Sequence, residues 1–335
     1  MAIVEVREQW LAQSTEAAND RARSIIDPHH HFFQDATEFP HYNLEQLWAD
    51  IGEHGVRGTV YLQCWEGYRR EGPEDMKCVG ETEWVESIAA RARQQPARPQ
   101  IRAMMGEAEL RNPRARAVLE AHCAASPLFR GIRQIAAWDE SSDVLFVMHG
   151  VTHPNLYAEP EFRAGFKVLG DMGLRFDAWH YHPQTPHLTT LARDFPDTLI
   201  VLDHLGTPCG IGQYEGQEDA VYARWAKDLA ELATCPNVYI KLGGMTMPWN
   251  GFHFDRLPAP PTSDQLVAKW ARYFHHAIDV FGPARAMFES NFPVDKCGTT
   301  YAVLWNAFKK LAARYTEAEQ DLMFRGAAAK FYGIE

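Results

Sequence analysis

The sequence predicts an α/β protein: a closed (β/α)8 TIM barrel in a single domain, with an N-terminal helical extension before it. Eight short apolar or β-branched runs recur along the 335 residues, and amphipathic helical patterns separate most of them. Repeated β-α units require parallel strands, and eight such units in a chain of this length favour a closed barrel over an open sheet. No G-x-G-x-x-G follows the first run, which argues against a dinucleotide-binding sheet.

The order of elements follows from the periodicity of the apolar residues. We expect strands at residues 24–27, 58–63, 100–105, 129–134, 174–179, 198–203, 237–242 and 285–289. Apolar residues at three- and four-residue spacing predict helices at residues 81–95, 113–124, 160–172, 186–195, 220–234 and 264–281. Strand and helix therefore alternate along the chain.

Two segments lie outside this pattern. Residues 1–23 form the N-terminal helical extension, which we expect to cap the bottom of the barrel or to contribute to an oligomer interface, and residues 24–335 form the barrel. Residues 245–261 are rich in proline and aromatic side chains and follow the seventh predicted strand. Loops at the carboxyl ends of barrel strands build the active-site face. We therefore expect this segment to be a lid, or a structural loop packed on a neighbouring subunit.

The composition excludes several classes of protein. With 33 Lys+Arg and 44 Asp+Glu, the formal charge is −11, which argues against a nucleic-acid-binding surface. No apolar stretch approaches the roughly 18 residues of a membrane helix, and the start MAIVEVREQW lacks the layout of a secretory signal. The six cysteines show no C-x-x-C spacing, which is typical of reduced structural thiols. We expect a cytoplasmic protein with a small-molecule substrate, no nucleic-acid or membrane partner, and a homodimer by default.

The histidines at predicted strand ends are the main candidates for chemistry. Asp27, His29 and His31 share one face at the end of the first strand, and two imidazoles at i and i+2 can approach a common point. A cluster held only by hydrogen bonds is the alternative. The sixth strand ends at Asp203-His204 beside a glycine turn, and the fifth is followed by His180 and His182, which have the same parity. In a barrel, histidines at these three strand ends converge above the axis.

Five motifs in the chain resemble the amidohydrolase-related branch of the amidohydrolase superfamily. They are Asp27-x-His29-x-His31, Phe129-Arg130-Gly131-Ile132-Arg133, His182-Pro183-Gln184, Leu202-Asp203-His204-x-Gly206 and Glu289-Ser290-Asn291-Phe292-Pro293-x-Asp295. That branch includes lactonases of sugar acids, a hydrolase of a pyrone dicarboxylate and decarboxylases of aromatic acids. The resemblance implies a site at the top of the barrel, with a His-x-His on the first strand, histidines near the fifth and sixth, and an acid after the eighth.

The sequence departs from this branch after the eighth strand. Members usually carry Gly-Ser-Asp-x-Pro there, with an aspartate that orients or deprotonates the attacking water, whereas this chain has Asn291. An amide cannot accept a proton at neutral pH. Glu289 lies one layer deeper, where we expect a buried hydrogen-bond partner. Asp295 is the other available carboxylate, either as the catalytic base or in a capping or ion-pair role with Lys296, and a histidine such as His182 is a third possibility.

The same histidines are also candidate ligands of a metal ion. Catalytic zinc sites usually have three protein ligands and an open position, and the resemblance points to His29, His31 and either His182 or His204 as ligands. Losing the anionic residue lowers the affinity for a dication. The sequence therefore leaves open one divalent cation, with Zn²⁺ as the first choice, or none.

Other side chains at the predicted barrel mouth suggest how a substrate is bound. Arg133 at the end of the fourth strand and Lys241 near the end of the seventh can hold a carboxylate, so we expect an anionic substrate. The alternatives are ion pairs of Arg133 with Glu107 or Asp139, and of Lys241 with Glu289 or Asp203. Further candidates for substrate contacts are Gln63, Trp138, Gln184 and Trp249.

These observations predict a hydrolase that opens a carboxylated or sugar-derived lactone by water attack at the ring carbonyl. His29, His31 and His204, with or without a metal, polarise the carbonyl and hold the water in this hypothesis. A metal-dependent non-oxidative decarboxylase of an aromatic acid is the first alternative. A binding protein that keeps the barrel but has lost turnover is the second, because Asn291 replaces the usual acid.

Overall fold

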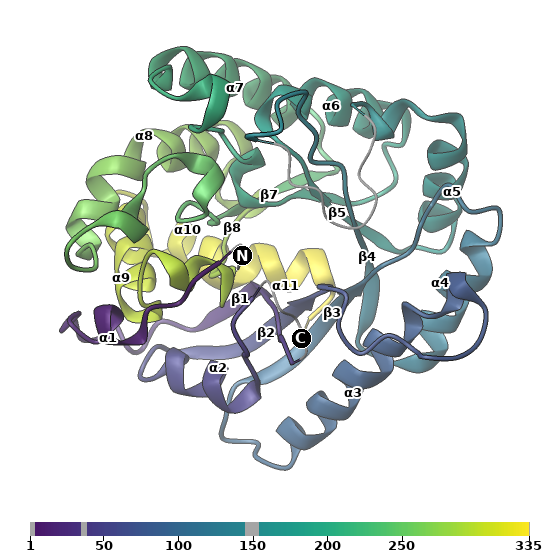
Figure 1. The fold of residues 1–335 in the computed structure, drawn as a ribbon, viewed down its shortest axis with the longest axis horizontal. Coiled ribbons are helices and arrows are strands. Elements are labelled where there is room, and N and C mark those ends of the chain that lie inside the picture. The colour runs from purple at the N-terminus through teal and green to yellow at the C-terminus, as the bar shows by residue number, and fades with distance from the viewer. Residues whose placement is uncertain (1–3, 35–38, 145–153, 335) are drawn as a thin grey trace.

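The computed structural model describes residues 4–34, 39–144 and 154–334, and its eight parallel strands form a barrel in the order β1 to β8 (Figure 1). The strands are β1 (Ile25–His30), β2 (Val56–Leu62), β3 (Gln100–Gly106), β4 (Phe129–Ile135), β5 (Arg175–Trp179), β6 (Ile200–Leu202), β7 (Val238–Leu242) and β8 (Ala286–Phe288). Each of the eight predicted strands is present. The first runs three residues further than expected, to His30, and so carries its histidines into the barrel.

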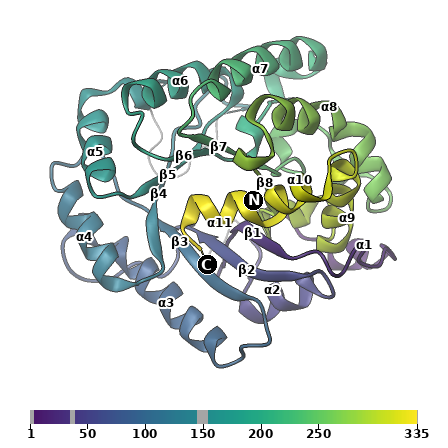
Figure 2. The same cartoon turned by 180° about the vertical axis from the view of Figure 1, so that it is seen from behind.

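Helices surround this barrel (Figures 1 and 2). They are α1 (Glu8–Leu11), α2 (Leu44–Ile51), α3 (Val79–Arg93), α4 (Ala115–Ala125), α5 (Pro160–Asp171), α6 (Thr185–Asp194), α7 (Glu218–Ala233), α8 (Ser263–Phe281), α9 (Tyr301–Ala312), α10 (Glu317–Asp321) and α11 (Ala327–Tyr332). All six predicted helices are present, and α2, α9, α10 and α11 are additional. Ten of the twelve residues of α9 are buried, Asn306 and Lys309 among them, so this helix lacks the polar face that reveals an amphipathic helix.

The barrel closes between β8 and β1 just beyond the end of β8. His30 pairs with Phe292 in a parallel bridge, and the backbone N–H of His31 donates to the carbonyl oxygen of Phe292 at 2.8 Å. The backbone N–H of Asn291 donates to the carbonyl oxygen of His29 at 2.9 Å. This closure sets the His-x-His segment directly beside the segment after β8.

The C-terminal helix α11 lies across one end of the barrel (Figure 2). Phe331 and Tyr332 pack with the inward-facing residues Val60, Met105 and Met287 in one buried cluster. Such packing fills the barrel interior as a core rather than a pore. The helix thereby brings the Tyr332 hydroxyl within 2.8 Å of Asp177 on β5.

The described part of the N-terminal extension, residues 4–23, runs outside the barrel. The Nε1 of Trp10 donates to the carbonyl oxygen of Leu257 at 2.9 Å, and Glu16 accepts from Ser263 at the start of α8. The extension therefore contacts the segment 245–261, while α11 covers the barrel end. In the described residues, no helix is long and apolar enough to cross a membrane.

Candidate active site

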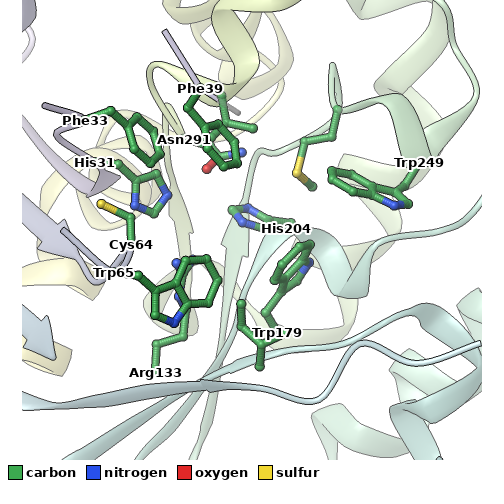
Figure 3. A pocket seen from close by; sticks show the side chains of 13 residues that line it. His31, Phe33, Phe39, Cys64, Trp65, Arg133, Trp179, His204, Trp249 and Asn291 are labelled. Carbon is green, nitrogen blue, oxygen red and sulfur yellow. The ribbon is translucent and has the colours of Figure 1, made fainter. Parts of the chain in front are cut away.

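Polar side chains from four strand ends meet at one cavity (Figure 3). His31 comes from the end of β1, Arg133 from β4, His204 from the turn after β6, and Asn291 from the segment after β8. The rest of the lining is apolar or aromatic, apart from Cys64. Residues that are far apart in the sequence thus face one space, as the strand-end pattern predicts.

Glu289 joins two of the histidines beneath this cavity. Its Oε1 accepts hydrogen bonds from the backbone N–H of His204 at 3.0 Å and from Nδ1 of the same residue at 2.7 Å. Its Oε2 lies 2.8 Å from Nδ1 of His29. Because a carboxylate only accepts, His204 carries its ring proton on Nδ1 and keeps the lone pair of Nε2 free for chemistry.

The backbone at His204 is in an unusual conformation. His204 has φ +55°, and the next three residues, through Thr207, also have positive φ. Gly244 makes this possible, because a Cβ at that position would lie 2.5 Å from the Cβ of His204. Asn291 has φ +54°. Non-glycine residues in this region are uncommon and cluster at functional sites, which supports a functional role for both residues.

His29 and His31 form a close pair on β1. Nδ1 of His31 donates to the carbonyl oxygen of Leu62 at 2.8 Å, and its Nε2 lies 3.1 Å from Nε2 of His29. Burial lowers the pKa of both imidazoles well below its usual value, and neighbouring cations lower it further: Lys241 for His29 and Arg133 for His31. Both rings are therefore neutral at pH 7.

Lys241 lies in a fully buried charged network at the level of His29. Its Nζ donates to Asp177 at 2.6 Å, lies 2.9 Å from Asp203, and lies 3.1 Å from Nδ1 of His29. Burial lowers the pKa of Lys241, but Asp177 and Asp203 more than offset this, and the net pKa is raised. Burial raises the pKa of Asp177 to about 7, against the opposing effect of Lys241. Lys241 is thus bound by internal carboxylates, which include Asp203 as the ion-pair alternative expects, and it is absent from the described cavity lining.

Arg133 does reach the cavity. Its Nη1 lies 3.3 Å from Nε2 of His29, and its Nη2 donates to the carbonyl oxygen of Gln63. The Gln63 side chain donates back to the Arg133 carbonyl oxygen at 3.3 Å, so this amide supports the arginine and is not part of the lining. Asp139, an expected ion-pair partner, instead accepts from the hydroxyl of Tyr214 at 2.8 Å.

Asn291 and Asp295 form a fixed pair. Nδ2 of Asn291 donates to Oδ2 of Asp295 at 2.5 Å, and Oδ1 of Asp295 accepts from the backbone and hydroxyl of Thr246 at 2.8 and 2.6 Å. Burial raises the pKa of Asp295 to about 6, although the hydrogen bonds from Thr246 and Asn291 oppose this. Asn291 lines the cavity and Asp295 lies behind it. Asp295 therefore positions the amide of Asn291.

Three other predicted site residues lie outside the described lining of the cavity. Nδ1 of His182 accepts from the backbone N–H of Cys209 at 3.2 Å. Gln184 accepts from the backbone N–H of Trp138 at 2.9 Å and donates to the carbonyl oxygen of Ala136 at 2.6 Å, so it ties two loops together. None of His182, Gln184 and Trp138 is among the described lining residues, whereas Trp249 is.

Part of the site was not recognised from the sequence. Asp177, which binds Lys241, lies within β5, three residues before His180. Of the aromatic lining, Trp249 was predicted, whereas Trp65 and Trp179 have the pattern of packing residues and nothing in the sequence distinguishes Phe33 and Phe39. Strand parity could have indicated Asp177, whereas the aromatic cavity depends on loops whose positions the sequence does not reveal.

The donor set has the composition that a divalent cation prefers. His29, His204 and Glu289 offer two imidazole nitrogens and one carboxylate oxygen within 4.8 Å of one another, and all three are buried. This set suits Zn²⁺. Lys241 and Arg133 lie 3.1 and 3.3 Å from the two ring nitrogens of His29, so a bound ion would experience their positive charge.

Comparisons with known proteins agree with this architecture. The amidohydrolase family model matches residues 26–334. The protein y4mH of Sinorhizobium fredii is 31% identical over 93% of this chain and 99% of its own length, and an L-fucono-1,5-lactonase of Burkholderia ambifaria is 25% identical over 92% of this chain and 96% of its own. A crystal structure of an amidohydrolase from Burkholderia multivorans with bound zinc superposes with a TM-score of 0.72, at 22% identity, over 93% of this chain and 99% of the other. The length of the family match, together with the barrel and its His-x-His strand, means that this chain belongs to the amidohydrolase family.

Proposed function

We propose that the protein is a hydrolase that opens a lactone by attack of water on the ring carbonyl. The observation that carries this proposal is the contact of Glu289 with both His29 and His204, next to a cavity that Arg133 also faces. Glu289 fixes the proton of His204 on Nδ1, so Nε2 is free to accept a proton from water. The carboxylate thus supports a base although Asn291 stands where relatives carry an aspartate.

The reaction follows from these groups. His204 takes a proton from water at Nε2 while the water oxygen bonds to the carbonyl carbon, and Glu289 stabilises the imidazolium that forms. Arg133 stabilises the negative charge that develops on the carbonyl oxygen. The ring carbon–oxygen bond then breaks, His204 returns the proton to the leaving oxygen, and the new carboxylic acid releases its own proton to the solvent. The product is a hydroxy acid whose carboxylate lies next to Arg133.

The roles of the remaining site residues are supportive. Asn291 is held by Asp295 and contacts the bound molecule or the water. If His29, His204 and Glu289 held a divalent cation instead, the cation would supply Lewis-acid polarisation of the carbonyl, and His204 would then be a ligand and not the base. The buried pairing of Lys241 with Asp177 and Asp203 keeps the centre rigid and limits its net charge.

A panel of lactones, followed by proton release in weak buffer, tests the proposal. The panel includes sugar lactones, muconic lactones and aryl-fused lactones. We expect ring opening of at least one member by the wild-type protein and a loss of about 10²-fold or more in kcat for His204→Asn. His180→Gln is the matched control, because His180 is buried against Tyr157 and Thr185 and is not among the lining residues.

Two outcomes would contradict the hydrolase proposal. The first is a folded protein that opens no lactone in the panel, and binding without turnover would then support the binding-protein alternative. The second is equal activity of His204→Asn and wild type. Release of carbon dioxide from an aromatic acid, dependent on a tightly held metal, would instead support the decarboxylase alternative.

A further inference from the structure

We infer that the substrate is a lactone with a flat apolar body, such as an aryl-fused ring, that carries neither ring hydroxyls nor a carboxylate of its own. This inference rests on the proposed function and names the substrate class for that same cavity. This substrate class differs from the sugar-derived or carboxylated lactone that the sequence suggests. The inference is based on the composition of the cavity lining.

Aromatic side chains dominate the lining (Figure 3). Phe33 and Phe39 stack with ring centroids 4.4 Å apart and an interplanar angle of 3°. Trp179 and Trp249 meet edge to face with centroids 5.8 Å apart. Such rings offer a large apolar area at low cost in conformational entropy, and they prefer flat apolar partners. A bound molecule would therefore lie between aromatic surfaces contributed by several separate segments.

The polar groups of the described lining are few, and several of their atoms are already engaged or assigned to the reacting groups, as Nε2 of His204 and the guanidinium of Arg133 are. His31 uses Nδ1 on the carbonyl oxygen of Leu62, and Asn291 uses its Nδ2 on Asp295. Gln63 and Gln184, which could recognise hydroxyls, are not among the described lining residues, and both side chains are hydrogen-bonded to other protein groups. The described lining therefore offers few unengaged polar atoms to the several ring hydroxyls of a sugar lactone. Each hydroxyl desolvated without a partner lowers kcat/KM by about tenfold or more.

The charge of the cavity lining limits the net charge that a substrate can carry. Among the described lining residues, Arg133 is the one permanent cation, because Lys241 is fully buried against Asp177 and Asp203. Opening a neutral lactone yields one carboxylate, which one guanidinium can pair in bidentate fashion. A substrate with its own carboxylate would leave a second anion in the product without a partner, which is unfavourable in an apolar cavity.

The first test measures turnover with three matched lactones. They are 3,4-dihydrocoumarin, L-fucono-1,5-lactone and 2-pyrone-4,6-dicarboxylate, each corrected for spontaneous hydrolysis. We expect kcat/KM for dihydrocoumarin to exceed the other two values at least 100-fold. A higher kcat/KM for either of the other two lactones would overturn the inference and leave the lactonase proposal intact.

The second test measures binding and needs no turnover. Isothermal titration calorimetry compares 3-(2-hydroxyphenyl)propionate with L-fuconate and with an aromatic dicarboxylate. We expect the aryl monoacid to bind at least tenfold more tightly than the other two acids. Trp249→Leu should weaken it at least fivefold while leaving the binding of propionate, which can pair with Arg133 alone, within twofold.

These two tests separate the inference from the proposed function. Tighter binding of the aryl monoacid with no ring opening anywhere would support the cavity chemistry and contradict the hydrolase. Equal or tighter binding of the sugar acid or the dicarboxylate, or no binding of the aryl acid, would overturn the inference.

Discussion

Glu289→Gln is the sharpest perturbation of the proposed centre, because it removes one charge and keeps the shape of the side chain. The carboxylate contacts Nδ1 of His204 at 2.7 Å and Nδ1 of His29 at 2.8 Å, with no solvent exposure. An imidazolium formed on His204 would lose its counter-charge. Two unit charges about 4 Å apart interact by about 4 kcal/mol at an effective dielectric constant of about 20. This corresponds to a loss of about 10³-fold in kcat.

The assay is steady-state turnover of whichever lactone the wild-type protein opens, with thermal unfolding measured in parallel. Glu81→Gln is the matched control, because Glu81 is also fully buried and burial raises its pKa to about 7. Its Oε1 accepts from the Tyr61 hydroxyl at 2.8 Å and from the backbone N–H of Cys64 at 2.7 Å, and none of the described hydrogen bonds joins it to His29, His31 or His204. We expect Glu81→Gln to stay within threefold of wild type. A folded Glu289→Gln variant with kcat within threefold of wild type would refute the role assigned to Glu289.

The remaining predictions concern the departure from the family pattern and the metal. Asn291→Asp places two carboxyl groups in contact, since Nδ2 of Asn291 lies 2.5 Å from Asp295, whose own pKa is raised to about 6 by burial. The two carboxyl groups have higher pKa values in the folded protein than in the unfolded chain. The loss of unfolding free energy is therefore small near pH 4 to 5 and is complete at a pH above the raised pKa values. We expect a loss of about 3 kcal/mol in unfolding free energy at pH 8 and less than about 1 kcal/mol at pH 5, measured by denaturant unfolding. The exchanged double variant N291D/D295N should recover most of the loss at pH 8, and a pH-independent loss would contradict the explanation. Arg133→Met removes a positive charge 3.3 Å from Nε2 of His29 and should tighten Co²⁺ binding at least tenfold, read from visible absorption. The control variant Arg163→Met should leave Co²⁺ affinity unchanged. Equal Co²⁺ affinities of Arg133→Met and wild type would show that the guanidinium of Arg133 does not oppose metal binding.

The fold could be predicted because its cause is local and repeated. Each strand is a short apolar run, and most helices show an apolar stripe, so periodicity alone located eight strands and six helices. Three of the four missed helices have physical reasons, whereas α2 carries an ordinary amphipathic pattern. The helix α9 is buried on nearly all sides, and α10 and α11 flank a π-helical turn at Leu322–Gly326 in the short C-terminal segment.

The candidate site could be predicted in part, because strand parity places side chains on the barrel axis without knowledge of the loops. Parity indicated His29, His31 and Arg133, and the position next to a glycine turn after the sixth strand indicated His204; the structure brings all four to one centre. The same reasoning does not apply beyond the strand end, where the chain turns. His182 and Gln184 lie in such a turn, and both bond to neighbouring loops.

The sequence by itself therefore determined the barrel, the histidines at its mouth and the missing acid at Asn291, because these depend on local periodicity and on residue chemistry. Only the tertiary structure decided that Glu289 contacts two histidines, that Lys241 is neutralised from β5 and β6, and that aromatic residues line the cavity. Those contacts join residues tens to hundreds of positions apart. They arise from barrel closure and from loop packing, which no local pattern encodes.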